Sequence, residues 1–487
     1  MAWSSHGRRL NMRSQQERRD PEQAAALKAF ARHALAGVEP AAGWHLSASS
    51  HKLSLPHCSG KCAGLRPEAR NLVMADSAPG ATVQPTVVID DGRVSPGEKP
   101  KSFPDQSAEL ALVEWIRSNG GFVGSVNIDT RNGLRGLFVT KDVLAGELLL
   151  VIPKSCILSA EEDPKSGLSL TELMTARLVE TITRGKNREQ IESWPRQPDP
   201  VLHEWTPSEL QHLQSPKLAA GVAAIPQLLR QSHEKLLPFV KAEWPTVMWA
   251  DRMVRSRAFV FDEGWQGKRS MCMVPLVDFV NHRLLPTVGK DVFLDIDEQV
   301  VKLIAPEPLK AGDEVRITYK RNGNEKLLLD YGFAELLAPE QPSSEALHLD
   351  SLEPGCPLRL GSDELDEGAL TTLRQQVARR DQREAIKGDP ALDRAVCEAL
   401  LGICKAQLDR MPTSEADDRR SLSDIESSPP PDGMHVDRWR DALIFRIGQK
   451  WHLSRMVQVL SYLLSGGECS HKEVCDYLRR LRSFEMQ

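Results

Sequence analysis

The sequence has no long apolar run, few tyrosines and no strong excess of charge of either sign. None of its hydrophobic segments is long enough to cross a bilayer as a helix, so we expect no membrane partner. The 62 basic and 67 acidic residues give 487 residues a net charge of −5. This near balance argues against a nucleic-acid partner, which needs a strongly basic face. The length suggests about two to four domains, and we expect a monomer.

Cysteine is present but does not form a dense framework. The nine cysteines are scattered through the chain without the paired spacing of a disulfide scaffold. This pattern favours a reducing compartment, in which the thiols serve as small core residues. His57, Cys58 and Cys62 could form half of a zinc site, but no second ligand pair follows at the usual spacing. We therefore expect no bound metal.

The first part of the chain, residues 1–105, is predicted to be a low-order extension. It is rich in Pro, Gly and Ser, and it contains one predicted helix at residues 21–36. Several arginines near its start suggest a transit peptide, whereas the neighbouring acidic residues argue against one. A floppy extension is the alternative. We expect a cytoplasmic or plastid location, with a nuclear one not excluded.

Strands and helices are predicted to alternate after Ser107. The run "AELALVEWIRS" has the spacing of an amphipathic helix, and "GLFVT" and "ELLLVIP" are typical of strands. The middle of the chain, residues 161–255, is predicted to be helical. Two capping boxes, Ser169 with Glu172 and Thr206 with Glu209, mark helix starts there. Strand character returns at residues 258–260, 300–305 and 314–319.

Two similar turns, "LAGE" and "KAGD", each lead directly into a strand. They are interpreted as two turns of one all-β unit. From about residue 345 the chain is predicted to be helical to its end and to form a separate lobe, with one helix beginning at Asp389. Residues 414–433 are polar and Pro-rich, and are predicted to be a loop.

The polar residues of "VDFVNH" stand at the end of an apolar run. Asp278, Asn281 and His282 follow "MCMVPLV", where a buried segment usually ends on turn residues. Further on, "TYKRNGNEKLLLDYGF" contains Tyr319 and Tyr331, two of only four tyrosines in the chain. A short helix at residues 325–330 is predicted between them, with Asn324 as its cap and Gly332 at its end.

In this order, "VPLVDFVNH", "AGDEVRITY" and "LLLDYGF" resemble the closing motifs of a SET domain. The upstream "GLRGLFVTKDVLAGELLLVIP" resembles its opening motif. "VRSRAF" and "ALIFRIGQK" are similar to motifs of the Rubisco large-subunit lysine methyltransferase branch. The resemblance implies an α+β fold, with a mainly-β SET domain at 106–335. A helical insert at 161–255 would interrupt this domain, and an all-α substrate-binding lobe would follow at 345–487.

The same resemblance implies a protein-lysine N-methyltransferase that uses S-adenosylmethionine. Tyr331 and Tyr319 would be the catalytic residues, with Tyr331 as the main positioning phenol. Phe259, Tyr331 and Phe333 would bind the substrate lysine. The cofactor would contact Gly136, Leu137, Phe138, Arg257, Asp278, Asn281, His282 and Tyr319. The partner would be a protein with an accessible lysine, and we expect a non-histone protein because no zinc-binding cysteine cluster follows "YGF".

Two alternatives stay open at this point. A relative of the same fold can methylate histidine, and a SET-like module can bind a partner without catalysis. The sequence departs from the family pattern at Arg283, where relatives usually carry a small residue, and at Lys320 and Gly323. These departures bear on cofactor affinity more than on the fold.

Overall fold

The computed structural model describes most of the chain after Pro104. The described residues are 106–131, 133–284, 292–295, 298–319, 323–336, 347–350, 352–353, 358–360, 363–386, 388–466, 472–474 and 476. All of them belong to one compact unit. The predicted extension at 1–105, its helix at 21–36, and the trio His57, Cys58 and Cys62 lie outside them. Within the described residues, no helix is long and apolar enough to cross a membrane.

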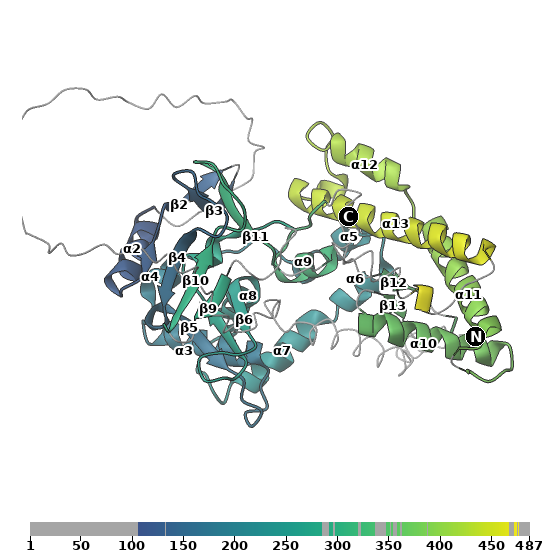
Figure 1. Cartoon of the computed structure of the whole chain (residues 1–487), viewed down its shortest axis with the longest axis horizontal. Helices are drawn as coiled ribbons and strands as arrows, with labels where there is room; N and C mark the ends of the chain where they lie inside the picture. Colours follow the sequence, from purple (N-terminus) through teal and green to yellow (C-terminus); the bar gives the residue numbers. More distant parts are fainter. Residues whose placement is uncertain are drawn as a thin grey trace, which may run out of the picture. The chain divides into compact units, whose positions relative to one another are not determined.

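The first part of the fold consists of one helix and two four-stranded sheets (Figure 1). The predicted helix is α2 (Gln106–Ser118). One sheet has the order β1-β4-β10-β9, formed by Phe122–Val123, Leu148–Pro153, Val300–Ile304 and Val292–Asp295. The other has the order β2-β3-β11-β8, formed by Val126–Arg131, Leu134–Val139, Glu314–Ile317 and Asn281–His282. The strands expected from "GLFVT", "ELLLVIP" and "EVRITY" are therefore confirmed.

The third sheet carries the helical insert. Its order is β5-β7-β6, formed by Leu158–Glu161, Ser270–Met273 and Ala258–Phe261. The insert leaves from β5 and returns through β6. It contains α3 (Leu170–Thr183), α4 (Arg188–Glu192), the 3₁₀ helix η2 (Leu202–Glu204), α5 (Pro207–Gln211), α6 (Pro216–Val222), α7 (Ile225–Leu236) and α8 (Trp244–Arg257). Both predicted capping boxes form, because Ser169 and Thr206 accept hydrogen bonds from the backbones of Glu172 and Glu209.

The two Ala-Gly-acid turns lie against each other, as expected for turns of one β unit. Val143 and Leu309 exchange two backbone hydrogen bonds, of 2.9 and 3.0 Å. Gly146 and Gly312 have φ angles of 80° and 92°, in the left-handed region that favours glycine. The turns connect the sheet that carries β3 and β11 to the sheet that carries β4 and β10.

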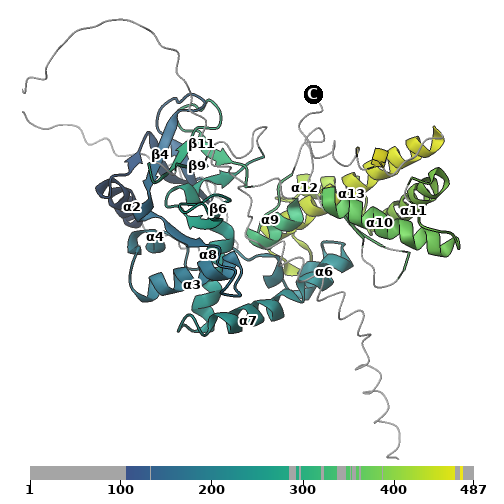
Figure 2. The same ribbon diagram turned by 60° about the horizontal axis from the view of Figure 1, so that its bottom comes forward.

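The C-terminal part differs from its prediction in two places. It is not helical throughout, since β12 (Leu347–Leu349) and β13 (Leu358–Leu360) form an antiparallel pair. Three long helices follow these strands: α10 (Asp363–Arg380), α11 (Pro390–Asp409) and α13 (Val436–Ser465). Asp389 caps α11 as expected. Figure 2 shows these elements from a second direction.

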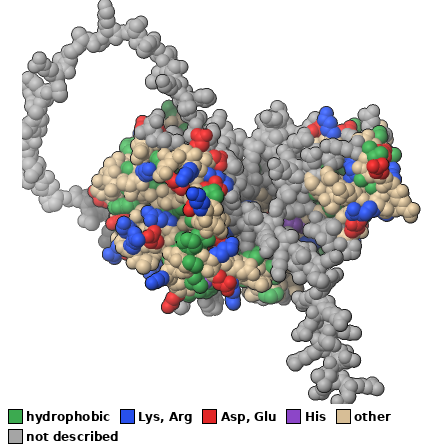
Figure 3. All heavy atoms as spheres, turned by 90° about the horizontal axis from the view of Figure 1, so that it is seen from below, with side chains coloured by type: hydrophobic (Ala, Val, Ile, Leu, Met, Phe, Trp, Pro, Cys, Tyr) green, Lys and Arg blue, Asp and Glu red, His purple; other side chains and the backbone are tan. Residues whose placement is uncertain are grey.

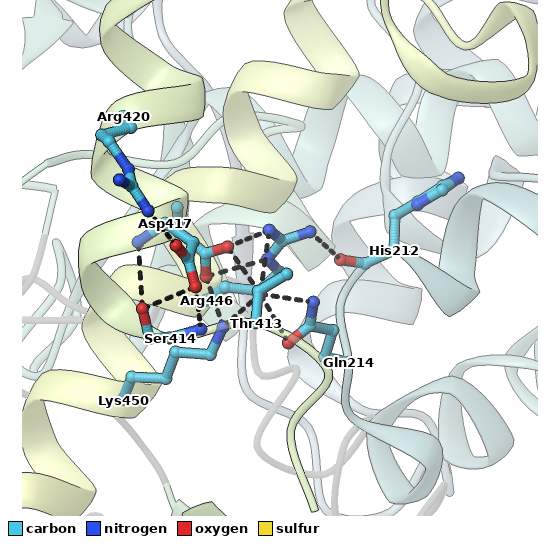
Figure 4. Close-up of polar contacts among 9 residues, drawn as sticks. His212, Gln214, Thr413, Ser414, Asp417, Arg420, Arg446 and Lys450 are labelled. Carbon is cyan, nitrogen blue, oxygen red and sulfur yellow. Dashed lines mark hydrogen bonds and ion pairs between the residues drawn. The ribbon is translucent and has the colours of Figure 1, made fainter.

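The predicted loop at 414–433 contains a helix, α12 (Glu415–Ser423), which begins with a capping box at Ser414. The helix was missed because its buried residue is Asp418 rather than an apolar side chain. Arg446 and Lys450 of α13 bind the Asp418 carboxylate. Figure 4 shows both cations beside Thr413, which also hydrogen-bonds to Gln214 of the insert.

The C-terminal helices have a core of their own and share a second core with the insert. Leucines of β12, β13, α10, α11 and α13 form the first core. The second joins α13 to α9 (Asn324–Asp330) and to the insert, through residues such as Phe445, Leu328 and Trp205. The C-terminal helices therefore pack against α9 and the insert through a continuous apolar cluster.

The surface carries charges of both signs (Figure 3), and the cysteines in the described ranges are buried. Lys and Arg side chains are interspersed with Asp and Glu on the face that Figure 3 shows. Cys156, Cys272 and Cys404 are free and buried, as expected for core thiols. Cys397 is disulfide-bonded, which differs from that expectation. Among the described residues, no group of His, Cys, Asp or Glu has the arrangement of a metal site.

Candidate functional site

A parallel strand pair brings the "NH" motif to the first tyrosine. In the register of β8 with β11, Asn281 lies opposite Arg316 and His282 lies opposite Ile317. The strand β11 ends at Ile317, and Tyr319 follows it. The Tyr319 hydroxyl donates a hydrogen bond of 2.6 Å to the carbonyl of Val280. Two motifs that are far apart in the sequence therefore meet at one edge of the sheet.

The side-chain amide of Asn281 is held in one orientation. Its Nδ2 donates to the Arg135 carbonyl at 2.9 Å and to Glu314 Oε1 at 2.6 Å. Both partners are acceptors, so the nitrogen must face them and its two N–H groups are used within the protein. The oxygen Oδ1 is then the part of this side chain that is suited to a ligand, and it would accept from a donor.

Gly136 is needed because of this pair. A Cβ atom at this position would lie 2.5 Å from Glu314 Oε1 and 2.9 Å from Asn281 Nδ2. No side chain fits without displacing a carboxylate that is itself held by Arg316. The close approach at this position is therefore made by protein atoms, and a cofactor contact of Gly136 stays a prediction.

Four aromatic rings form a continuous cluster beside Asn281. The ring centroids of Tyr319 and Tyr331 are 4.9 Å apart. His282 lies 5.2 Å from Tyr319 and 5.9 Å from Phe333, and Phe333 lies 6.1 Å from Tyr331. The short helix α9 sets the position of the second tyrosine, as predicted. The structure therefore brings together the two predicted catalytic residues, Tyr319 and Tyr331, and two of the three predicted substrate residues, Tyr331 and Phe333.

The imidazole of His282 is a structural bridge within this cluster. Its Nδ1 accepts a hydrogen bond of 2.9 Å from the backbone N–H of Tyr319. The Nε2 atom is therefore the protonated one in the neutral ring, and it lies 3.1 Å from Glu335 Oε2. Burial raises the pKa of Glu335, but the hydrogen bond from His282 and the attraction to it outweigh burial and lower the pKa.

Asp278 and Arg257 are hydrogen-bonded to each other, and each has a buried polar atom without a partner among the described residues. Asp278 Oδ2 accepts from the indole Nε1 of Trp194 at 2.6 Å, and its backbone carbonyl accepts from Arg257 Nη1 at 2.8 Å. Within the described residues, Asp278 Oδ1 and Arg257 Nε are buried and have no hydrogen-bond partner. Burial raises the pKa of Asp278 despite the nearby Arg257 and the Trp194 hydrogen bond.

Neither phenol of the pair is suited to act as a phenolate. Burial raises the pKa of Tyr319 above its usual range, although Arg257 acts in the opposite direction. Burial also raises the pKa of Tyr331 well above its usual range, and Asp330 adds to the effect. Both hydroxyls therefore stay protonated near neutral pH and can act as hydrogen-bonding dipoles.

The remaining predicted residues, Leu137, Phe138 and Phe259, are buried and lie in the strands β3 and β6. Leu137 belongs to the main core, whereas Phe138 is covered by the Arg131 guanidinium, which lies 4.0 Å from the ring centroid. Phe259 belongs to the same main core, against which Tyr319 packs. The structure places Phe259 in β6.

Four residues of the site were not predicted from the sequence: Trp194, Arg135, Glu314 and Glu335. Arg135 is buried with its guanidinium 4.4 Å from the Phe279 ring centroid, and burial, with the repulsion of Arg257, lowers its pKa to about 10. Glu314 follows the second Ala-Gly-acid turn, which was interpreted only as a turn. The only sequence signal for Glu314 was its place directly after Asp313 of this turn.

One local prediction was wrong, and one departure from the family pattern can now be placed. Asn324 does not cap α9, because Gly323 holds the cap position and Asn324 instead exchanges two hydrogen bonds with the backbone of Glu335. Gly332, with a φ of 82°, does end the helix. The Arg283 side chain is half-exposed and pairs with Glu307, so it points away from the aromatic cluster. Lys320 lies outside the described residues.

Comparison with known proteins finds relatives of part of this chain. Residues 134–320 match the SET domain family model. The "N-lysine methyltransferase SETD6" of Mus musculus is 24% identical over 278 residues, which are 48% of this chain and 55% of that protein. The Rattus norvegicus SETD6 is 23% identical over 279 residues, again covering 48% and 55%. The chain therefore spans about half the length of these curated relatives.

Solved structures show the same fold over a longer stretch. Rubisco LSMT bound to AdoMet has a TM-score of 0.55 and 19% identity, covering 78% of this chain and 96% of that one. The SET domain of LSMT bound to lysine and AdoHcy has a TM-score of 0.55 and 18% identity, with the same coverage. Residues 134–320 are thus similar to a SET domain, in a chain that has the α+β fold of the Rubisco LSMT structures.

Proposed function

We propose that this chain is an S-adenosylmethionine-dependent protein-lysine N-methyltransferase. One observation carries the proposal: Tyr319 and Tyr331, with ring centroids 4.9 Å apart, lie beside an Asn281 amide that can offer only its oxygen to a ligand. The relatives named above support it, because SETD6 is named an N-lysine methyltransferase and LSMT has been seen with lysine and AdoHcy.

The residues around Asn281 fit the amino-acid end of S-adenosylmethionine, which carries an ammonium group and a carboxylate. Asn281 Oδ1 and the unpaired Asp278 Oδ1 are acceptors that suit the ammonium. The unpaired Nε of Arg257 is a donor that suits the carboxylate. The absence of a side chain at Gly136 lets Glu314 hold the Asn281 amide with its oxygen free to face the ligand. When bound, the cofactor supplies a methyl group on a positively charged sulfur.

The protein's own contribution is to bind, to orient and to exclude water. The attacking lysine must be neutral, and apolar surroundings favour its neutral form by disfavouring the ammonium. The hydroxyls of Tyr319 and Tyr331 stay protonated, so they orient the amine and the methyl group rather than remove a proton. Holding the reacting atoms in line lowers the barrier by several kcal/mol. The lysine nitrogen forms the new bond to carbon while the bond to sulfur breaks, and water takes the proton.

The proposed substrate is a non-histone protein with an accessible lysine. This choice rests on the helices α10 to α13, which follow "YGF" where histone-directed relatives have a cysteine cluster. The histidine alternative is less well supported, because this chain has a tyrosine, Tyr331, at the "YGF" position, where a histidine-specific relative has none. The chain is proposed to act as a monomer without nucleic acid.

Turnover with a labelled methyl donor and candidate substrate proteins tests the proposal. Tyr331→Phe should lower kcat about a hundredfold, because the amine loses an orienting contact. Tyr462→Phe is the matched control, since Tyr462 is 78% exposed on α13, and it should leave kcat unchanged. Mass spectrometry should place the label on a lysine side chain. Label on histidine would favour the alternative enzyme, and no binding of S-adenosylmethionine would favour a non-catalytic module.

A further inference from the structure

The segment that carries Tyr331 and Phe333 is held on three sides, by hydrogen bonds on two of them and by close packing on the other. From its own helix, the Leu327 carbonyl accepts from the backbone N–H groups of Tyr331 and Gly332, at 2.9 and 3.0 Å. On the side of the insert, Gly332 packs so closely on the Pro200 carbonyl that a Cβ atom would lie 2.6 Å from it. On the third side, the Ala334 backbone N–H donates 2.9 Å to Asp441 Oδ1.

The third bond comes from the C-terminal helix α13. Asp441 is on the buried face of this helix, one position before Ala442 of the core that α13 shares with α9 and the insert. Ala334 packs against the same core. The hydrogen bond therefore joins the C-terminal lobe to the backbone of Ala334, the residue after Phe333. Its surroundings are largely apolar, and a hydrogen bond is stronger in such an environment.

The charges around this bond come from three parts of the chain. Asp437 and Arg440 are on α13 itself, and Asp199 is on the insert loop before η2. From α9, Asp330 pairs with Lys326 at 2.8 Å. Burial raises the pKa of Asp441 to about 7, and the hydrogen bond from Ala334 only partly opposes burial. The carboxyl group therefore changes charge within the physiological range.

We propose that Asp441 is a positioning residue for the Tyr331–Phe333 segment, so that the C-terminal lobe takes part in setting the geometry of methyl transfer as well as in holding the substrate. This inference rests on the proposed function. The Asp441 carboxylate accepts the hydrogen bond from the Ala334 N–H and so holds the backbone after Phe333. Together with the close packing of Gly332 on Pro200, this contact sets the angle at which the Tyr331 phenol enters the aromatic cluster.

The test compares two substitutions at this position. Asp441→Ala removes the acceptor, so kcat should fall about tenfold to a hundredfold, because small misplacements of an orienting group are costly. KM for the protein substrate and the affinity for S-adenosylmethionine should stay near the wild-type values. Asp441→Asn keeps an oxygen acceptor and should restore most of kcat. Asp409→Asn, at the exposed end of α11 in the same lobe, is the control and should behave as wild type.

The pH profile separates positioning from a merely structural role. The ratio of wild-type kcat to Asp441→Asn kcat should rise as pH increases through about 7, since only the wild type gains a charged acceptor. Asp441→Ala with wild-type kcat, or a ratio that does not change with pH, would overturn the inference. Calorimetric binding of S-adenosylmethionine by each variant shows separately whether the proposed function itself fails.

Discussion

Two buried aspartates, Asp278 in the site and Asp418 in the lobe, differ in how completely the protein satisfies them. Both oxygens of Asp418 have protein partners, from Arg446, Lys450 and Thr413 (Figure 4). Asp278 has one oxygen bonded to Trp194, and the other has no hydrogen-bond partner among the described residues.

The difference separates a polar group that builds the fold from one that is suited to a ligand. A buried carboxylate with all its partners in place holds elements together, and removing it leaves those partners unpaired. A buried carboxylate with an unpaired oxygen costs stability, and such exceptions need an explanation in a native protein. At Asp278 the proposed cofactor supplies that explanation.

Substitution of Asp418 should produce the largest effect on stability. Asp418→Asn removes the charge that Arg446 and Lys450 share, so we expect the free energy of unfolding to fall by about 3 kcal/mol. Burial alone would raise the pKa of Asp418, but hydrogen bonds from Arg446, Lys450 and Thr413 outweigh it and lower the pKa. The stabilisation is therefore present above about pH 4 and is lost as pH falls through the lowered pKa. Denaturant titration at several pH values measures both effects.

Glu426→Gln provides the control for this experiment. Glu426 pairs with Arg440 in the same lobe, but its side chain is 82% exposed. An exposed pair contributes little, so its loss should leave the unfolding midpoint unchanged. Equal effects of the two substitutions would contradict the assignment of Asp418 as a structural group.

Substitution of Asn281 should have an intermediate effect, on binding rather than on folding. Asn281→Ala removes the oxygen proposed for the cofactor ammonium, a charged hydrogen bond worth about 1.5–3 kcal/mol. Calorimetry should therefore show affinity for S-adenosylmethionine at least tenfold weaker. Asn127→Ala, on the exposed face of β2, should bind as wild type does. Unchanged affinity in Asn281→Ala would remove Asn281 from the proposed site.

Substitution of Asp278 should have the smallest effect on stability, although it is the same chemical change as at Asp418. Because burial raises the Asp278 pKa, this group favours the folded state most below about pH 4 and loses that contribution as pH rises through the raised pKa. Asp278→Asn should thus unfold at pH 7 within about 1 kcal/mol of wild type, or be more stable. A loss as large as that of Asp418→Asn would erase the contrast between the two regions.

The sequence predicted the features that depend on local patterns. The apolar spacing of α2 and α11, the capping boxes at Ser169 and Thr206, and the order of the SET motifs are all readable without the structure. The residues of "VDFVNH" and the two tyrosines could be chosen for the same reason. Their types and order already resembled a known site.

The partners that fix those residues could not be predicted in the same way. Trp194 and Asp278 are 84 positions apart, and nothing local to either residue names the other. Asn324 had the sequence of a helix cap, but its side chain bonds to the Glu335 backbone instead. Local capping lost to a tertiary contact there, and the helix α12 was missed because its buried position is charged.

The order β5-β7-β6 bears on how such a protein can change over evolutionary time. Leu158 and Ala258 both lie opposite Met273, so the insert leaves and re-enters the sheet on two strands that flank the same partner. The insert leaves at Glu161, opposite Ser270, and returns at Ala258, opposite Met273, so both of its ends are anchored on β7. An excursion of this kind can lengthen, shorten or be exchanged between homologues without altering the strands that position Asn281 and Tyr319. Trp194 and Arg257 limit such exchange, because both donate hydrogen bonds to Asp278, and any replacement insert would need donors at those places.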